Sequence, residues 1–184
     1  MNAEILVGKT AQEWFRETLS DALSQRRMKI QEVTEFYLVN LLASFLERER
    51  LFVEEPDGTA QTEPLALVLL RALQRDARSR DRELRRLGDT ALFVSGFFGD
   101  SLARSLVDVD YYISMGERAY GTLAGSARAG QGDLYGELAD RFAAFVDLFA
   151  EIAELSNLRS NRGLLRLYER FLLTRSERVM RNRS

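Results

Sequence analysis

The chain has 184 residues, a net charge of −2 and a hydrophobic fraction of 46%, and it contains neither histidine nor cysteine. The two missing residue types exclude Ser-His-Asp and Cys-His catalysis, zinc fingers, iron–sulfur clusters, and haem ligated by histidine or cysteine. Disulfides are excluded as well, and the apolar fraction is large enough for one domain to fold around its own core.

The chain lacks the signals of export and of membrane insertion. Its first residues contain no basic stretch followed by a long apolar one, so they do not resemble a signal peptide. The longest apolar runs, such as 91–94, are far shorter than the ~20 residues that span a bilayer. We therefore expect a cytoplasmic protein in which residues 1–184 form a single helical domain, with frayed ends at 1–9 and 181–184.

Apolar residues recur every three to four positions along nearly the whole chain, which is the pattern of amphipathic helices. Thr10 and Glu13 have the spacing of a capping box, so a first helix is expected over 10–26. A second helix is expected over 30–50, where the apolar arc is wide enough to indicate a central position. The sequence Glu-Glu-Pro-Asp-Gly then predicts a loop over 52–62.

The middle of the chain predicts two further helices. A third is expected over 63–87, with Thr62 as its N-cap and Pro64 in the first turn, where proline is tolerated. Its second half is mostly charged and is expected to project into solvent. Gly88 is predicted to end this helix, and a fourth follows over 88–106. The fourth helix carries small side chains that form a ridge at helical spacing: Ser95, Gly96, Gly99 and Ala103.

The last third predicts three more helical segments. One is expected over 110–125, and glycines mark a loop over 125–132. A long helix over 133–155 and a final one over 160–180 complete the chain. The periodicity thus predicts an all-α fold, a single compact bundle of about six to seven helices, several of them long, in up-down packing with one or two crossovers.

Candidates for metal binding and catalysis are few. Asp108 and Asp110 are the nearest approach to an oxygen-ligand pair for Mg²⁺ or Mn²⁺, but capping of the helix over 110–125 explains both aspartates without a metal. No metal and no other cofactor is therefore expected, and no catalytic residues are assigned. The balance is against an enzyme.

A small-ligand pocket is one alternative function. Aromatic walls together with one arginine suit an anionic or apolar ligand, held between the helices over 88–106 and 110–125. The residues that would contact such a ligand are Tyr111, Tyr112, Ser114, Arg118 and Tyr120.

Nucleic-acid binding is a weaker alternative. The chain has 24 arginines against 2 lysines, and arginines cluster in residues 71–86 and 159–183. Clustered arginines suit phosphate contacts, but acidic blocks alternate with them and would repel a duplex. Solvated helix faces, in a composition typical of a GC-rich genome, explain the arginines more simply.

Protein association is the function that the sequence favours. The ridge of small residues and the widely apolar helix over 30–50 supply more packing surface than one bundle easily buries. We therefore expect a non-catalytic interaction, scaffold or regulatory module that forms a homo-oligomer or binds another protein. The interface is expected at Ser95, Gly96, Gly99 and Ala103.

Overall fold

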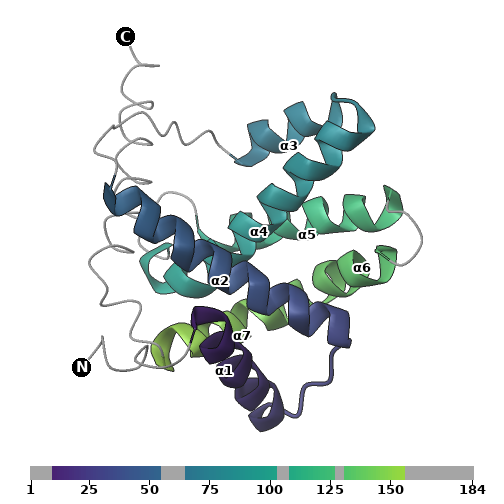
Figure 1. Cartoon of the computed structure of the whole chain (residues 1–184). Coiled ribbons are helices and arrows are strands. Elements are labelled where there is room, and N and C mark those ends of the chain that lie inside the picture. The colour runs from purple at the N-terminus through teal and green to yellow at the C-terminus, as the bar shows by residue number, and fades with distance from the viewer. Residues whose placement is uncertain (1–9, 55–64, 103–107, 127–130, 156–184) are drawn as a thin grey trace.

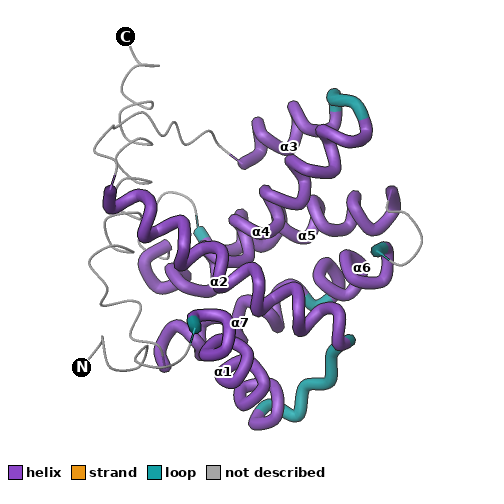
Figure 2. The backbone as a smooth tube through the Cα atoms, in the orientation of Figure 1, coloured by secondary structure: helices purple, strands orange, loops and turns teal. Residues whose placement is uncertain are grey.

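A computed structural model describes residues 10–54, 65–102, 108–126 and 131–155, with only the backbone given for 47–54 and Ser101 (Figure 1). All regular secondary structure in these ranges is helical, and short loops join the helices (Figure 2). The expected all-α bundle is therefore confirmed. The seven described helices are α1 (Ala11–Gln25), α2 (Glu32–Glu54), α3 (Leu65–Leu73), α4 (Ala77–Leu102), α5 (Val109–Ser126), α6 (Gly132–Asp140) and α7 (Phe142–Leu155).

The helices are arranged around α4 and α5. Helix α2 lies across them, α6 packs beside α5, and α1 and α7 lie at one end (Figure 1). Helix α3 folds back on the first half of α4 and forms a hairpin that projects at the other end. Buried leucine, phenylalanine and alanine side chains fill the space between the helices. No helix in the described part combines the length and the apolar character that crossing a bilayer would need.

The start of the fold follows the sequence closely. The backbone N–H of Glu13 donates to Oγ1 of Thr10 at 3.2 Å, and the N–H of Thr10 donates to Oε2 of Glu13 at 2.7 Å. This is the predicted capping box, and it begins α1 where the spacing indicated. Phe15 and Leu19 then bury one face of α1, which packs against α2 and α7.

The beginning of α2 is fixed by a side chain from α6. Oε2 of Glu137 accepts from the Thr34 hydroxyl at 2.6 Å and from the backbone N–H of Gln31 at 3.2 Å. A carboxylate at this place also interacts favourably with the positive end of the helix dipole. Arg141 reinforces the contact, because its Nη1 donates to the Lys29 carbonyl at 2.6 Å and to Glu137 at 3.2 Å.

The expectation of one helix over 63–87 is wrong. The chain breaks at 74–76, so α3 and α4 are separate helices. Asp76 causes the break, because its Oδ1 accepts from the backbone N–H of Ser79 at 3.1 Å and thereby caps α4. Gly88, which was expected to end a helix, lies inside α4 instead.

Gly88 has a packing role rather than a terminating one. A Cβ atom at this position would lie 2.5 Å from Cε1 of Tyr120, so only glycine lets α5 approach α4 this closely. Two further glycines are required in the same way, Gly96 by Phe149 and Gly116 by Phe142. Close crossings therefore hold α4, α5 and α7 together.

The expectation of one helix over 133–155 is also wrong, because α6 ends and α7 begins around Arg141. Arg141 leaves helical geometry with φ −114° and ψ 20°. The apolar stripe continues through this bend, so periodicity carries no sign of it. A second departure that periodicity does not show is a kink inside α4 at Phe98, where φ is −123° and ψ is 16°.

Two predicted boundaries differ from those of the structure, and several others lie outside the described residues. Helix α2 continues into the predicted loop as far as Glu54, and α5 continues to Ser126. Outside the described residues lie the rest of the loop over 52–62, most of the loop over 125–132, the end of the helix over 88–106, the helix over 160–180, and the frayed ends at 1–9 and 181–184.

Two alanine substitutions distinguish required from unrequired glycines. Gly88→Ala is expected to lower the free energy of unfolding by about 1–3 kcal/mol, because the buried, hydrogen-bonded Tyr120 ring cannot move aside. Gly136→Ala in α6 meets no atom within 4 Å and is expected to raise that free energy by up to about 1 kcal/mol. Urea unfolding followed by circular dichroism measures both. Equal midpoints for Gly88→Ala and the wild type would rule out the tight crossing.

Candidate functional site

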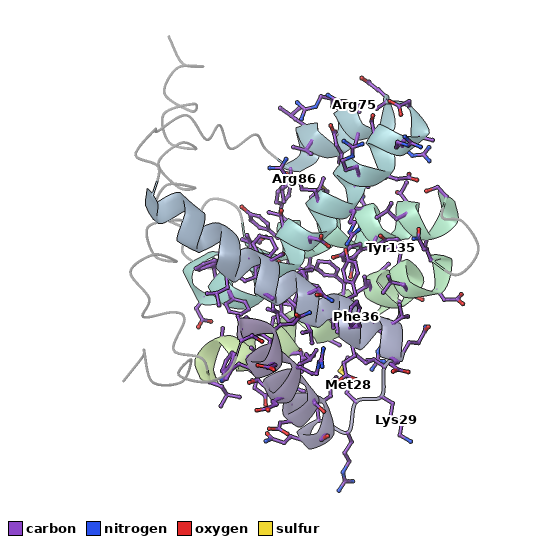
Figure 3. The ribbon with its side chains drawn as sticks, viewed as in Figure 1. Met28, Lys29, Phe36, Arg75, Arg86 and Tyr135 are labelled. Atoms are coloured by element: carbon purple, nitrogen blue, oxygen red, sulfur yellow. The ribbon has the colours of Figure 1, made fainter. Side chains whose placement is uncertain are left out.

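A cluster of polar side chains lies where four helices meet. The hydroxyls of Tyr37 in α2 and Tyr120 in α5 both donate to Oδ1 of Asp89 in α4, at 2.5 and 2.7 Å. Nε of Arg85, one turn earlier in α4, donates to the Tyr37 hydroxyl at 3.2 Å. The ring of Tyr135 in α6 stands edge-on to Tyr37 and stacks on Tyr120, near the middle of the molecule (Figure 3). We call these five residues the Asp89 cluster.

Burial sets the electrostatics of the Asp89 cluster. It raises the pKa of Tyr37 and of Tyr120 well above the usual tyrosine value, and the neighbouring Asp89 carboxylate raises both further. Burial is also the main reason that the pKa of Tyr135 is raised. All three phenols are therefore protonated at neutral pH, in the form that donates hydrogen bonds.

The geometry of the cluster suits positioning rather than chemistry. Tyr120 is fully buried and Tyr37 is 9% exposed, so a substrate cannot reach their hydroxyls without separating the helices. Both hydroxyls already donate to Asp89. The cluster ties α2 and α5 to one point on α4 through hydrogen bonds, and α6 packs on those two tyrosines through the ring of Tyr135.

The structure separates the residues predicted to line a ligand pocket, which are Tyr111, Tyr112, Ser114, Arg118 and Tyr120 of α5. Tyr112 and Tyr120 are buried in the core, Arg118 is exposed, and Tyr111 and Ser114 are intermediate. The space between α4 and α5 next to Gly88 is filled by the Tyr120 ring itself. The rings of Tyr111 and Tyr112 stand edge-on with their centroids 5.7 Å apart, whereas Arg118 is exposed and Tyr120 is buried.

The residues predicted to form an interface lie mostly inside the chain's own packing. Ser95 is buried, and Gly96 is in contact with α7. A Cβ atom at Gly99 would be in ordinary contact with Val109 of α5. Ala103 lies outside the described residues. Ser95 and Gly96 thus lie within the packing between helices of one chain.

An exposed apolar stripe lies elsewhere, on α3. Leu67, Leu70 and Leu73 are 51%, 56% and 49% exposed, and their spacing places them on one side of the helix. The opposite side, with the buried Ala72, packs on α4 and α5. The hydroxyl of Tyr111 also holds α3, since it accepts from the backbone N–H of Ala66 at 3.0 Å.

A row of arginines follows on the first half of α4. Arg78, Arg82 and Arg86 are exposed and four residues apart, so like charges stand next to one another on the helix. The acidic residues of this segment are engaged elsewhere: Asp76 caps α4, Asp81 pairs with Arg80 at 3.1 Å, and Glu83 pairs with Arg75 at 2.9 Å. Figure 3 shows Arg75 and Arg86 on the projecting hairpin.

We call the three leucines and the three arginines together the hairpin surface. Sequence reasoning did not identify it as a site, although one signal was present. Every residue of 65–73 except Arg71 is apolar, and a helix that projects from a bundle cannot bury all its sides. The sequence alone offers two interpretations of the arginine run, phosphate contacts and a solvated face, and neither of them indicates a protein interface.

Comparisons with protein-family models, with curated proteins and with solved structures give no match. In the part of the chain that the structure describes, no three acidic side chains come together in a way that would hold a metal ion. What the chain does must therefore be inferred from its own surfaces.

Removing one hydroxyl tests the Asp89 cluster. Tyr37→Phe is expected to lower the free energy of unfolding at neutral pH by about 1.5–3 kcal/mol, because a charged acceptor loses a buried donor. Urea unfolding of the variant and the wild type measures the difference. A change of less than about 0.5 kcal/mol, the range usual for surface substitutions, would contradict the proposed contribution of this hydroxyl.

The same cluster predicts a loss of stability in alkali. Tyrosines in the unfolded chain ionise near pH 10, whereas Tyr37 and Tyr120 have raised pKa values and keep their protons in the folded state. Their contribution is complete below about pH 10 and falls above it by about 1.4 kcal/mol per pH unit for each residue. Tyr37→Phe should show a shallower decline than the wild type in unfolding measured across this range, and an unchanged slope would contradict the assignment.

Proposed function

We propose that this protein is an interaction module that works by binding, and that it self-associates through the hairpin surface. The observation that carries the proposal is the stripe formed by Leu67, Leu70 and Leu73, each about half exposed on a helix that no other described helix covers from that side. Complete burial of a leucine is worth about 1.5–3 kcal/mol, so covering the stripe is a substantial driving force for association.

The Asp89 cluster supports this function from within. Asp89 and Arg85 belong to α4, the helix whose first half forms one arm of the hairpin. Hydrogen bonds from α2 and α5 hold that helix at this point, so the hairpin extends from an anchored base. A binding surface that is already ordered loses less conformational entropy when a partner docks.

The alternative of a small-ligand pocket needs a different arrangement. It needs the tyrosines of α5 turned toward a common space beside α4, whereas the ring of Tyr120 packs directly on Gly88. Arg118, the cation assigned to an anionic ligand, is exposed rather than turned toward Tyr120. Association through α3 is therefore the function that the geometry favours.

Polar substitutions in the leucine stripe test the proposal. Leu67→Ser combined with Leu70→Ser should weaken self-association by about tenfold or more, since a loss of about 1.4 kcal/mol is one factor of ten. The fold should be unaffected, because both side chains are already half exposed. Sedimentation equilibrium over a range of concentrations measures association, and circular dichroism confirms the fold.

A matched control lies on α2. Val33 and Phe36 are exposed to a similar degree but lie on a different helix, so the pair Val33→Ser and Phe36→Ser should associate like the wild type. A wild-type protein that stays monomeric at the highest concentration would refute self-association. Unchanged association in the leucine variant would refute the role of α3.

A further inference from the structure

We propose that the hairpin surface of one copy docks on the outer side of α5 and α6 of a second copy. This α5–α6 surface has a floor of small residues and an acidic rim: Gly121, Gly136 and Ala139, with Glu117, Asp133 and Asp140. The inference rests on the proposed function and adds the identity of the partner surface.

Opposite charge is the first reason for this pairing. Residues 71–86 contain seven arginines and three acidic residues, whereas α5 and α6 together contain five acidic residues and one arginine. Two hairpins placed against each other would bring their arginine rows together, and like charges across an interface are unfavourable. The hairpin therefore needs a surface of different sign, and every copy of the chain carries one.

The acidic rim is available for such a contact. Glu117 of α5 and Asp133 and Asp140 of α6 are exposed. None of the three has an ion pair with another residue that the structure describes. Carboxylates and guanidinium groups form strong, charge-assisted hydrogen bonds, so the rim matches the chemistry of Arg78, Arg82 and Arg86.

The floor supplies the second reason. A Cβ atom at Gly136 would meet nothing within 4 Å, and one at Gly121 would only touch Cβ of Ala139 at 4.0 Å. The chain's own packing thus does not require glycine here, unlike at Gly88 and Gly96. Glycine is a poor helix former, and close approach by an outside helix accounts for it at both positions. Leucine side chains from α3 can lie over this floor of two glycines and one alanine.

The two surfaces lie on different parts of the molecule, since the hairpin projects beyond α5 and α6 (Figure 1). Each copy therefore offers one surface of each kind. Reciprocal contacts across a two-fold axis close a dimer, and a single contact repeated from copy to copy forms a ring or a chain. In either case the association is weakened by salt, because exposed charges are screened.

Charge reversal in two separate chains gives the most direct test. One variant reverses the hairpin (Arg78→Glu, Arg82→Glu, Arg86→Glu), and the other reverses the rim (Glu117→Arg, Asp133→Arg, Asp140→Arg). Each variant alone has two surfaces of like sign and should associate at least about tenfold more weakly than the wild type. An equimolar mixture restores opposite signs at both contacts, so sedimentation should show association close to that of the wild type.

A steric variant tests the floor without changing charge. Gly136→Leu is expected to keep or raise the wild-type melting temperature, because its Cβ has no neighbour within 4 Å and leucine is a better helix former than glycine, and to lose self-association because it fills the floor. Val33→Ser with Phe36→Ser serves again as the control that associates normally.

Specific results would overturn the inference. A mixture that remains monomeric, a rim-reversed variant that associates like the wild type, or a Gly136→Leu variant that associates normally would each remove the α5–α6 surface as the partner. If Leu67→Ser with Leu70→Ser still abolishes association in that case, the proposed function stands and only the partner surface is wrong. Wild-type protein that stays monomeric yet binds anionic vesicles or a DNA oligonucleotide through the arginines would replace the second copy with a polyanion.

Discussion

A single carboxylate oxygen joins α2, α4 and α5 at the centre of the bundle. Oδ1 of Asp89 accepts hydroxyls from Tyr37 and Tyr120, which come from helices on different sides of α4. A charge withdrawn from water is costly unless it is hydrogen-bonded, and these two donors together with the nearby Arg85 supply what water would otherwise provide. Gly88 makes the arrangement possible, because any side chain there would displace the Tyr120 ring. Gly88 thus allows the close approach of α5 to α4, and the adjacent Asp89 binds α5 through the hydroxyl of Tyr120.

The projecting hairpin follows from this anchor. Helix α4 runs from the anchored centre out to Ala77, where Asp76 starts it, and α3 folds back along it. Tyr111 ties the first turn of α3 to α5. The hairpin is therefore held at its base, while its outer side carries half-exposed leucines and exposed arginines. Stability is concentrated in the centre, and the surface that we propose for recognition is on the part that extends beyond it.

The periodicity of apolar residues alone was sufficient to predict the fold class, because the spacing of these residues within each helix indicates which side is buried. It could not reveal Asp76 or Arg141 as breaks, since the helical pattern passes through both. The Asp89 cluster was out of reach for another reason: its members lie between positions 37 and 135, and which helices face each other is decided by tertiary packing. Tyr120 was noticed as an aromatic residue, but its place in the core depends on Gly88, one helix away.

The glycines also show what cannot be predicted from the sequence alone. Gly96 and Gly136 look alike in the sequence, each a glycine within a helix. A Cβ atom would clash with Phe149 at the first and meet nothing at the second. Only the structure separates a glycine that the chain's own packing requires from one that it does not. Hydrogen–deuterium exchange in dilute and concentrated protein tests the resulting account most directly. We predict that concentration increases protection in α3, α5 and α6 and leaves α1 unchanged; protection that does not change in α3, or that rises only in α1 and α2, would contradict it.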